Sequence, residues 1–135
     1  MFAPRIALPQ HLGRHVHADL FLDTAPYNAG TTANDALFMG LPVLTCAGST
    51  MVSRGAGSQL HAIGVPELVT TSWRDYEALA IRLAQHPDEL AALRARIVAN
   101  RNTHPLFDME RFAHNLGDAL VEVWRNHSAQ ISSIY

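Results

Sequence analysis

The sequence predicts an α/β fold, in which helices flank a parallel sheet and the C-terminal half is helical. Over residues 1–70, short apolar runs alternate with helical patterns, which is typical of parallel strands joined by helices. Beyond residue 70, apolar residues recur only at helical spacing. The chain has 135 residues, of which 48% are hydrophobic and 16% charged, so we expect one compact domain spanning residues 1–135.

We expect strands where a compact apolar run ends at a polar or turn residue. The four candidates are 5–8 ("RIAL"), 19–23 ("DLFLD"), 41–46 ("LPVLTC") and 66–69 ("PELV"). Continuous apolar runs are typical of strands that are buried on both faces, as in parallel sheets. Because four strands make a small sheet and strand material begins almost at Met1, we expect a fragment of a larger protein whose other strands lie upstream.

Helices are expected between and after these strands. In the first half they cover 10–17, 31–40 and 51–64, and in the second half 72–87, 88–102 and 108–127. Pro9 suits a helix entry, and Gly40 and Gly64 suit helix ends.

The three C-terminal helices carry apolar stripes, so residues 71–130 are expected to be helical. Ser72 and Asp88 suit the starts of the first two. On the stripe pattern we predict that Trp73, Phe112 and Trp124 lie in the core. We expect the tail, residues 128–135, to be frayed or held by another molecule.

Charge and composition argue against several classes of protein. The formal net charge is −2, and all ten basic residues are arginines, whereas a nucleic-acid binder of this size usually has a basic excess. No apolar run approaches the ~18 residues of a membrane-spanning helix, and "MFAPRIALPQ" lacks the apolar stretch of a signal peptide. Cys46 is the only cysteine, which fits a core thiol in a reducing compartment. We therefore predict a cytoplasmic protein without nucleic-acid or membrane partners.

The segment 26–37, "PYNAGTTANDAL", is the strongest candidate for a ligand site. It follows a predicted strand, and ligands of open parallel sheets bind beyond the carboxyl ends of strands. Gly30 permits close approach of the backbone, and the first amide groups of the helix, at Thr31 and Thr32, favour a phosphate. Asp35, on the first turn, can accept hydrogen bonds from ribose hydroxyls. The alternative is a capping box formed by Thr32 and Asp35, and the two readings are compatible.

A second cluster lies in "HLGRHVH", where His11, Arg14 and His15 fall within one helical turn. An imidazole can stack on a base, and an arginine can pair with phosphate. The alternatives are a solvated surface, or zinc bound by the two histidines, although no glutamate follows His11 as in metalloproteases. Arg54 lies near another helix start beyond a strand end, and either faces the same cleft or is a surface arginine.

The long stretch "ADLFLDTAPYNAGTTANDAL", with "HPLFDMERFAHNL" near the end, resembles the C-terminal catalytic lobe of the O-linked N-acetylglucosamine transferase family, in particular bacterial members that follow TPR repeats. The resemblance covers nearly the whole chain. It implies a GT-B fold, in which two Rossmann-like lobes hold the sugar nucleotide between them. It further implies inverting transfer of GlcNAc from UDP-GlcNAc to a protein Ser or Thr, without a metal or other cofactor.

The resemblance also implies roles for individual residues. Thr31 and Thr32 match the family's diphosphate-binding threonines, and Asp35 matches the aspartate that holds the ribose. His11 matches a histidine near the uridine, and Arg14 an arginine on the same helix. The family's acceptor-side residues lie in the upstream lobe, so we predict no catalytic residue in this chain and little or no activity of the chain alone.

Two positions depart from the animal members of the family. Gly30 stands in place of a histidine, although bacterial relatives often read "AGTT", and Leu8 stands in place of a lysine that contacts the uracil region. These departures leave two alternatives open. One is a transferase that uses another nucleotide sugar, such as GDP-fucose, and the other is a non-catalytic α/β interaction module that no longer binds nucleotide.

Overall fold

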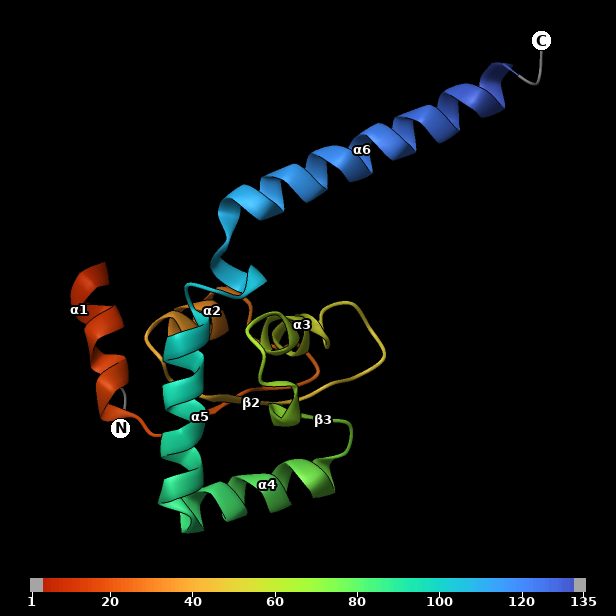
Figure 1. Cartoon of the computed structure of the whole chain (residues 1–135). Helices are drawn as coiled ribbons and strands as arrows, with labels where there is room; N and C mark the ends of the chain where they lie inside the picture. Colours follow the sequence, from red (N-terminus) through yellow and green to blue (C-terminus); the bar gives the residue numbers. More distant parts are fainter. Residues whose placement is uncertain (1–3, 133–135) are drawn as a thin grey trace.

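The computed structural model describes residues 4–132, with side chains as far as residue 128, and contains a parallel sheet between helices (Figure 1). The sheet has three strands in the order β1-β2-β3: Phe21–Leu22, Val43–Cys46 and Val69–Thr70. Both pairings are parallel, with Phe21 opposite Val43 and Thr45 opposite Val69. The predicted α/β class is confirmed.

Helices occupy most of the remaining chain. They are α1 (Leu8–Gly13), η1 (Arg14–His17), α2 (Thr31–Phe38), α3 (Gly55–Ala62), η2 (Pro66–Leu68), α4 (Trp73–Gln85), α5 (Pro87–Asn100), η3 (Pro105–Phe107) and α6 (Met109–Ser132), where η marks a 3-10 helix. All strands of the described chain precede residue 71, so the helical C-terminal half is confirmed. Within residues 4–132, no helix has both the length and the apolar character needed to cross a membrane.

The strand expected at 5–8 is wrong. Residues 4–7 have no regular structure, and α1 begins at Leu8 with Pro9 in its first turn. Proline fixes φ at a helical value and has no N–H to give to a ladder, so it favours this helix start over a strand.

Two further boundaries differ from the expectation. The helix expected from residue 51 begins at Gly55, because residues 50–54 form a tight turn in which the Arg54 amide donates to Met51 O at 3.2 Å. The strand expected at 66–69 shares only Val69 with β3, because Pro66 opens the short helix η2 over residues 66–68 and β3 follows it.

The core lies between the sheet and the helices that cover it. Helices α2 and α3 pack on one face of β2 and α4 on the other, with α5 along the side (Figure 1). The largest completely buried side chains of these helices are Leu37, Leu60, Leu83 and Ile97. The predicted Ser72 cap is confirmed, since its Oγ accepts from the Asp75 amide at 3.1 Å. In contrast, α5 begins at Pro87, and no side chain caps it.

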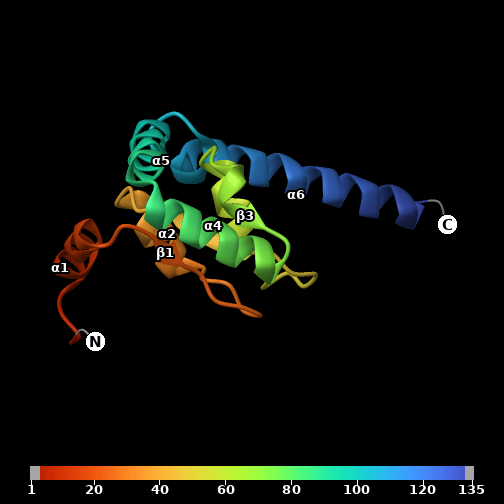
Figure 2. The ribbon, with the colours of Figure 1, turned by 90° about the horizontal axis from the view of Figure 1, so that it is seen from below.

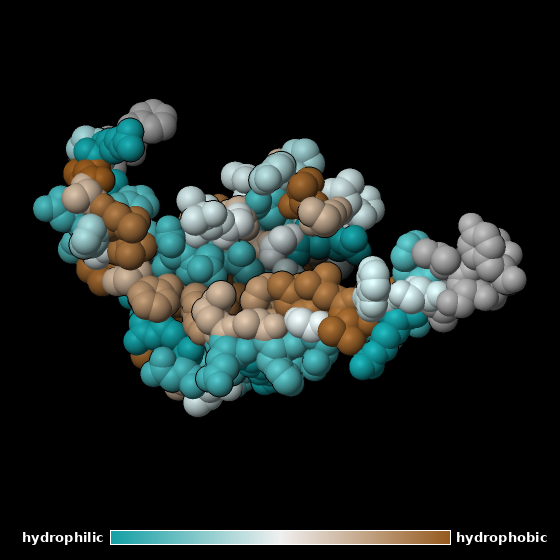
Figure 3. All heavy atoms as spheres, turned by 90° about the horizontal axis from the view of Figure 1, so that it is seen from above, coloured by the Kyte–Doolittle hydropathy of each residue, from teal (hydrophilic) through white to brown (hydrophobic). Residues whose placement is uncertain are grey.

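Helix α6 extends away from this body for 24 residues (Figures 1 and 2). Figure 3 shows a band of hydrophobic side chains along it. Phe112 and Trp124 on α6 are 56% and 69% exposed, and Trp73 on α4 is 57% exposed, so the prediction that these three lie in the core is wrong. An apolar stripe in the sequence indicates that a helix is amphipathic, but it does not indicate what packs against the apolar face. Residues 133–135 of the predicted tail lie outside the described chain.

Candidate functional site

The candidate site lies where β1 ends and the loop of residues 23–30 leads into α2. Asp23, a residue that is only 4% exposed, organises this loop. Its Oδ1 accepts hydrogen bonds from the backbone amides of Thr24 at 2.8 Å and Ala29 at 2.7 Å. Its Oδ2 accepts from Thr45 Oγ1 at 2.6 Å, on the neighbouring strand β2. One buried carboxylate therefore holds both ends of the loop against the sheet.

Asn28 is a second anchor of the same loop and is 3% exposed. Its backbone N–H donates to Val52 O at 3.0 Å, which ties the loop to the turn after β2. Its Nδ2 donates to Thr24 O at 2.8 Å, whereas its Oδ1 is buried and has no partner among the described residues. Sequence reasoning missed the roles of Asp23 and Asn28. The available signal was a polar residue directly after a buried strand and a second one just before the Gly-Thr-Thr.

The start of α2 is capped by Gly30 and not by a side chain. Thr31 and Thr32 are its first two residues, and both are exposed. The capping box predicted for Thr32 and Asp35 is therefore wrong, because a capping threonine must precede the helix in an extended conformation. Asp35 is the fifth residue of α2 and so lies just beyond the first turn, on which we predicted it.

The side chains of Thr31, Thr32 and Asp35 make no hydrogen bond or ion pair within the described chain. The first amides of a helix have no intrahelical partner, and here no side chain takes one up. This helix start thus presents free donors next to an unengaged carboxylate.

Two hollows flank the helix start. The Thr32 hollow, of about 390 Å³, lies on the β1 side and is lined by Phe21, Leu22, Asp23, Thr24, Tyr27, Asn28, Ala29, Gly30 and Thr32. The Arg54 hollow, of about 380 Å³, is lined by Tyr27, Asn28, Gly30, Met51, Val52, Arg54, Gly55 and Ser58. Gly30 lines both, so an anion bound at the start of α2 has space on either side of it.

The predicted contacts to a base lie elsewhere. His11 and Arg14 line the His11 hollow, of about 540 Å³, together with Leu8 and residues 4–6. Arg14 Nη2 donates to Pro4 O at 3.2 Å, and the His11 ring meets His15 edge to face at 5.5 Å. This hollow shares no lining residue with the Thr32 hollow. Across residues 4–132, no group of three or more His, Cys, Asp or Glu side chains is arranged to hold a metal.

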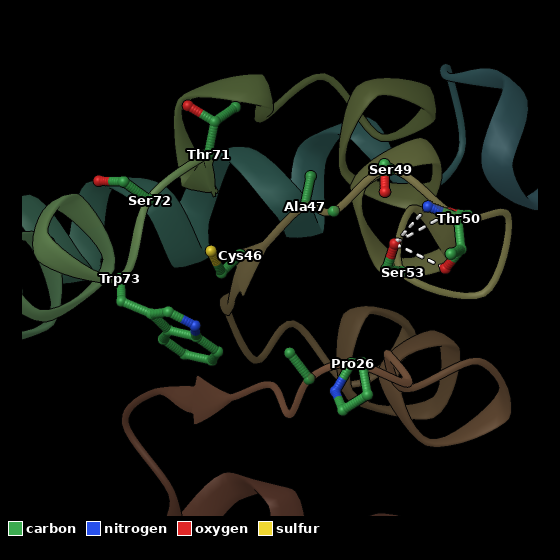
Figure 4. A pocket seen from close by; sticks show the side chains of 11 residues that line it. Pro26, Cys46, Ala47, Ser49, Thr50, Ser53, Thr71, Ser72 and Trp73 are labelled. Carbon is green, nitrogen blue, oxygen red and sulfur yellow. Dashed lines mark hydrogen bonds between the residues drawn. The ribbon is translucent and has the colours of Figure 1, made fainter.

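A further hollow of about 320 Å³ lies at the carboxyl ends of β2 and β3 (Figure 4). Cys46 lies at its base and is buried, as predicted for a core thiol, while Pro26 and Trp73 border it. The buried hydroxyl of Ser53, which also lines this hollow, is already engaged. Ser53 Oγ donates to Thr50 O at 2.9 Å and accepts from the Thr50 backbone amide at 3.0 Å. Sequence reasoning missed this hollow because its walls come from three separate segments.

Tyr76 of α4 links the site to the opposite face of the sheet, since its hydroxyl donates to Asp23 O at 2.9 Å. Burial, followed by the Asp23 carboxylate and the Cys46 thiol, raises the pKa of Tyr76 above its ordinary value of 10.0. The folded state therefore retains the proton at a pH where the unfolded chain loses it. This contribution to stability is complete below pH 10 and is lost as the pH rises through the raised pKa.

We accordingly expect the free energy of unfolding to fall above about pH 10. Urea unfolding of the wild type and of Tyr76→Phe, measured on both sides of that pH, tests this. Tyr76→Phe should be less stable at neutral pH, because the hydrogen bond to Asp23 O is lost. Its free energy of unfolding should also fall less than that of the wild type at alkaline pH. The exposed Tyr27→Phe is the matched control and should keep the wild-type slope. Equal slopes for all three proteins would contradict the prediction.

Comparison with known proteins agrees with this arrangement. The sequence model described as "Glycosyl transferase family 41" matches residues 1–116. The UDP-N-acetylglucosamine--peptide N-acetylglucosaminyltransferase of Caenorhabditis elegans is 36% identical over 129 residues, which is 96% of this chain and 11% of that protein. The probable UDP-N-acetylglucosamine--peptide N-acetylglucosaminyltransferase SEC of Arabidopsis thaliana is 37% identical over 119 residues, or 87% of this chain and 12% of that protein.

A solved structure is also similar. A mutant O-GlcNAc transferase of Thermobaculum terrenum superposes with a TM-score of 0.83 at 33% sequence identity. The match covers 92% of this chain and 23% of that chain. The present chain thus corresponds to only a small part of the proteins it is similar to.

Proposed function

Because the chain belongs to glycosyl transferase family 41, we propose that it forms the part of a protein O-glycosyltransferase that binds the nucleotide-sugar donor, with UDP-GlcNAc as that donor. Its three-stranded parallel sheet with flanking helices matches the C-terminal GT-B lobe of such enzymes. The chain spans about a ninth of the C. elegans relative, so the activity and the partners of a whole enzyme are part of the proposal.

The observation that carries the proposal is the start of α2. Breaking the bond between sugar and phosphate leaves negative charge on the departing diphosphate. Helix amides and hydroxyl groups that are fixed in advance and aimed at this charge stabilise it without reorganisation. Thr31 and Thr32 supply such groups, and neither hydroxyl is engaged elsewhere in the described chain. This supports departure of the diphosphate without help from a metal, and the inverting course and the protein Ser or Thr acceptor are further parts of the proposal.

The remaining residues of the proposed site bind the nucleoside. Asp35, whose carboxylate is unengaged, accepts bonds from the ribose hydroxyls. In this proposal His11 and Arg14 contact the base from α1 and the start of η1, where they line a hollow separate from the Thr32 hollow. Helix α1 stands apart from α2 at the edge of the body (Figures 1 and 2). The acceptor-side residues, TPR repeats and second lobe belong to the larger protein, and the cytoplasmic location is part of the same proposal.

Titration of the 135-residue chain with UDP, GDP and ADP, followed by calorimetry and backbone amide NMR, tests the proposal. We expect weak UDP binding with amide shifts at Thr31, Thr32 and Asp35. Thr31→Val should lower the affinity about tenfold or more, because it removes a hydrogen bond to a charged group. Thr71→Val is the matched control, since Thr71 is also exposed and makes no side-chain hydrogen bond in the described chain.

Each alternative predicts a different result. Tighter binding of GDP than of UDP would favour a GDP-sugar donor, such as GDP-fucose. Failure of the chain to bind any of the three nucleotides would contradict donor binding and favour a non-catalytic interaction module.

A further inference from the structure

The Arg54 hollow is a second concavity at the start of α2, beside the Thr32 hollow. Two hydrogen bonds fix its walls. Gln59 Nε2 of α3 donates to Gly30 O at 3.1 Å, and the Asn28 amide donates to Val52 O at 3.0 Å. The loop of residues 23–30 is therefore tied both to α3 and to the turn that carries Arg54, and Gly30 and Arg54 lie on the walls of the same hollow.

Arg54 itself is oriented by the turn that precedes α3. Its amide donates to Met51 O at 3.2 Å, and its Nε donates to Thr50 O at 3.3 Å. The two Nη groups have no partner in the described part of the chain. The guanidinium is thus anchored through one nitrogen and keeps its bidentate edge free for a ligand.

The electrostatics of this hollow favour an anion. Arg54 is the N-cap residue of α3, so the starts of α2 and α3 both border the hollow, and neither start has a side-chain cap. Each start adds a partial positive charge to that of the guanidinium. None of the residues that line the hollow carries a carboxylate.

One buried acceptor of a residue that lines the hollow, and a second behind its wall, have room in their hydrogen bonding for a donor. Asn28 Oδ1 and Gln59 Oε1 are both buried without a donor within the described chain. Asn28 lines the hollow, and Gln59 bonds to Gly30 on its wall. Buried polar atoms without partners are rare, and they mark places where a bound group completes the network. A diphosphate that is linked to a sugar carries both the charge and the hydroxyl donors.

From this geometry we infer that Arg54 binds the diphosphate of the nucleotide sugar, as a residue of the donor site in addition to Thr31 and Thr32. The inference rests on the proposed function, and it identifies the fixed positive charge of that site. The sequence contains no lysine, so within this chain only an arginine or a protonated histidine can supply such a charge.

Calorimetric titration of wild type, Arg54→Ala, Arg54→Lys and Arg74→Ala with uridine, UMP and UDP tests the inference. We expect Arg54→Ala to lower the UDP affinity about tenfold or more and to leave uridine binding unchanged. Arg54→Lys, which keeps the charge and loses the bidentate geometry, should lie in between. Arg74→Ala removes an exposed arginine from the first turn of another helix and should bind UDP like the wild type.

The outcomes separate this inference from the proposed function. If Thr31→Val weakens UDP binding while Arg54→Ala does not, the donor site stands and Arg54 is not part of it. If Arg54→Ala weakens uridine and UDP equally, the residue does not act through phosphate, and the inference is also overturned. Circular dichroism of each variant establishes that it is folded before the affinities are compared.

Discussion

Replacement of Asp23 by alanine is expected to lower the free energy of unfolding by about 3 kcal/mol and to abolish nucleotide binding. The substitution leaves the amides of Thr24 and Ala29 and the hydroxyl of Thr45 without their acceptor. A buried donor without a partner costs about 1–3 kcal/mol, and solvent entry into the loosened loop offsets part of that sum. The loop would then no longer hold Gly30 and the start of α2 in a fixed position.

Two controls separate this network from a general effect of charge. Asp23→Asn keeps an oxygen for the two amides and turns its NH2 toward the Thr45 hydroxyl, which can accept, so we expect a loss of only about 1 kcal/mol. Asp19→Ala removes an exposed carboxylate four residues earlier and should be nearly neutral. Urea unfolding measures all three variants. If Asp23→Ala were no less stable than Asp19→Ala, the buried carboxylate would not organise the loop.

The loop of residues 23–30 connects stability to the proposed function. Its carboxylate anchor reaches β2 through Thr45, and its backbone reaches α4 through Tyr76. A strand of the sheet and a helix on one of its faces thereby fix the position of one helix start. A binding site for a departing anion benefits from this rigidity, because donors that are already oriented need no reorganisation during the reaction.

The parts of the fold that could be predicted are those governed by local patterns. Buried parallel strands appear as compact apolar runs, and two of the expected strands contain β1 and β2. Left-handed glycines at helix ends were also predictable, since Gly40 has a φ of 78° and Gly64 a φ of 81°. The segment "RIAL" has the same apolar pattern as a strand, but Pro9 allowed the helix to begin earlier.

Features that depend on distant parts of the chain could not be predicted from local patterns. The exposure of Phe112 and Trp124 depends on what packs against α6, which mainly contacts η3 within the described chain. The capping box of Thr32 and Asp35 is absent because Gly30 is the N-cap residue and Thr32 lies inside the helix. The place of Arg54 on the wall of a hollow depends on the turn of residues 50–54. The role of Asn28 as an anchor of its loop depends on the position of Val52.

Gly64→Ala is expected to lower the free energy of unfolding by about 3 kcal/mol. Gly64 follows α3 with a φ of +81°, where a Cβ costs about 1–2 kcal/mol. The added carbon would also lie 2.8 Å from Asn100 Nδ2 and 2.8 Å from the ring of His104. Asn100 Nδ2 donates to Ile63 O at 2.8 Å, so its displacement breaks a bond between α5 and the end of α3, worth about 1 kcal/mol.

A matched glycine distinguishes this strain from the ordinary effect of alanine. Gly13 has a right-handed φ of −58°, and a Cβ there would meet nothing within 4 Å. Gly13→Ala should therefore be neutral or stabilising by up to about 1 kcal/mol, through the smaller entropy of the unfolded chain. Urea unfolding of the two variants compares them directly, and similar stabilities would show that α5 does not enforce the tight approach at Gly64. Because such domains are stable by only about 5–15 kcal/mol, the expected loss at Gly64 is a large fraction of the total.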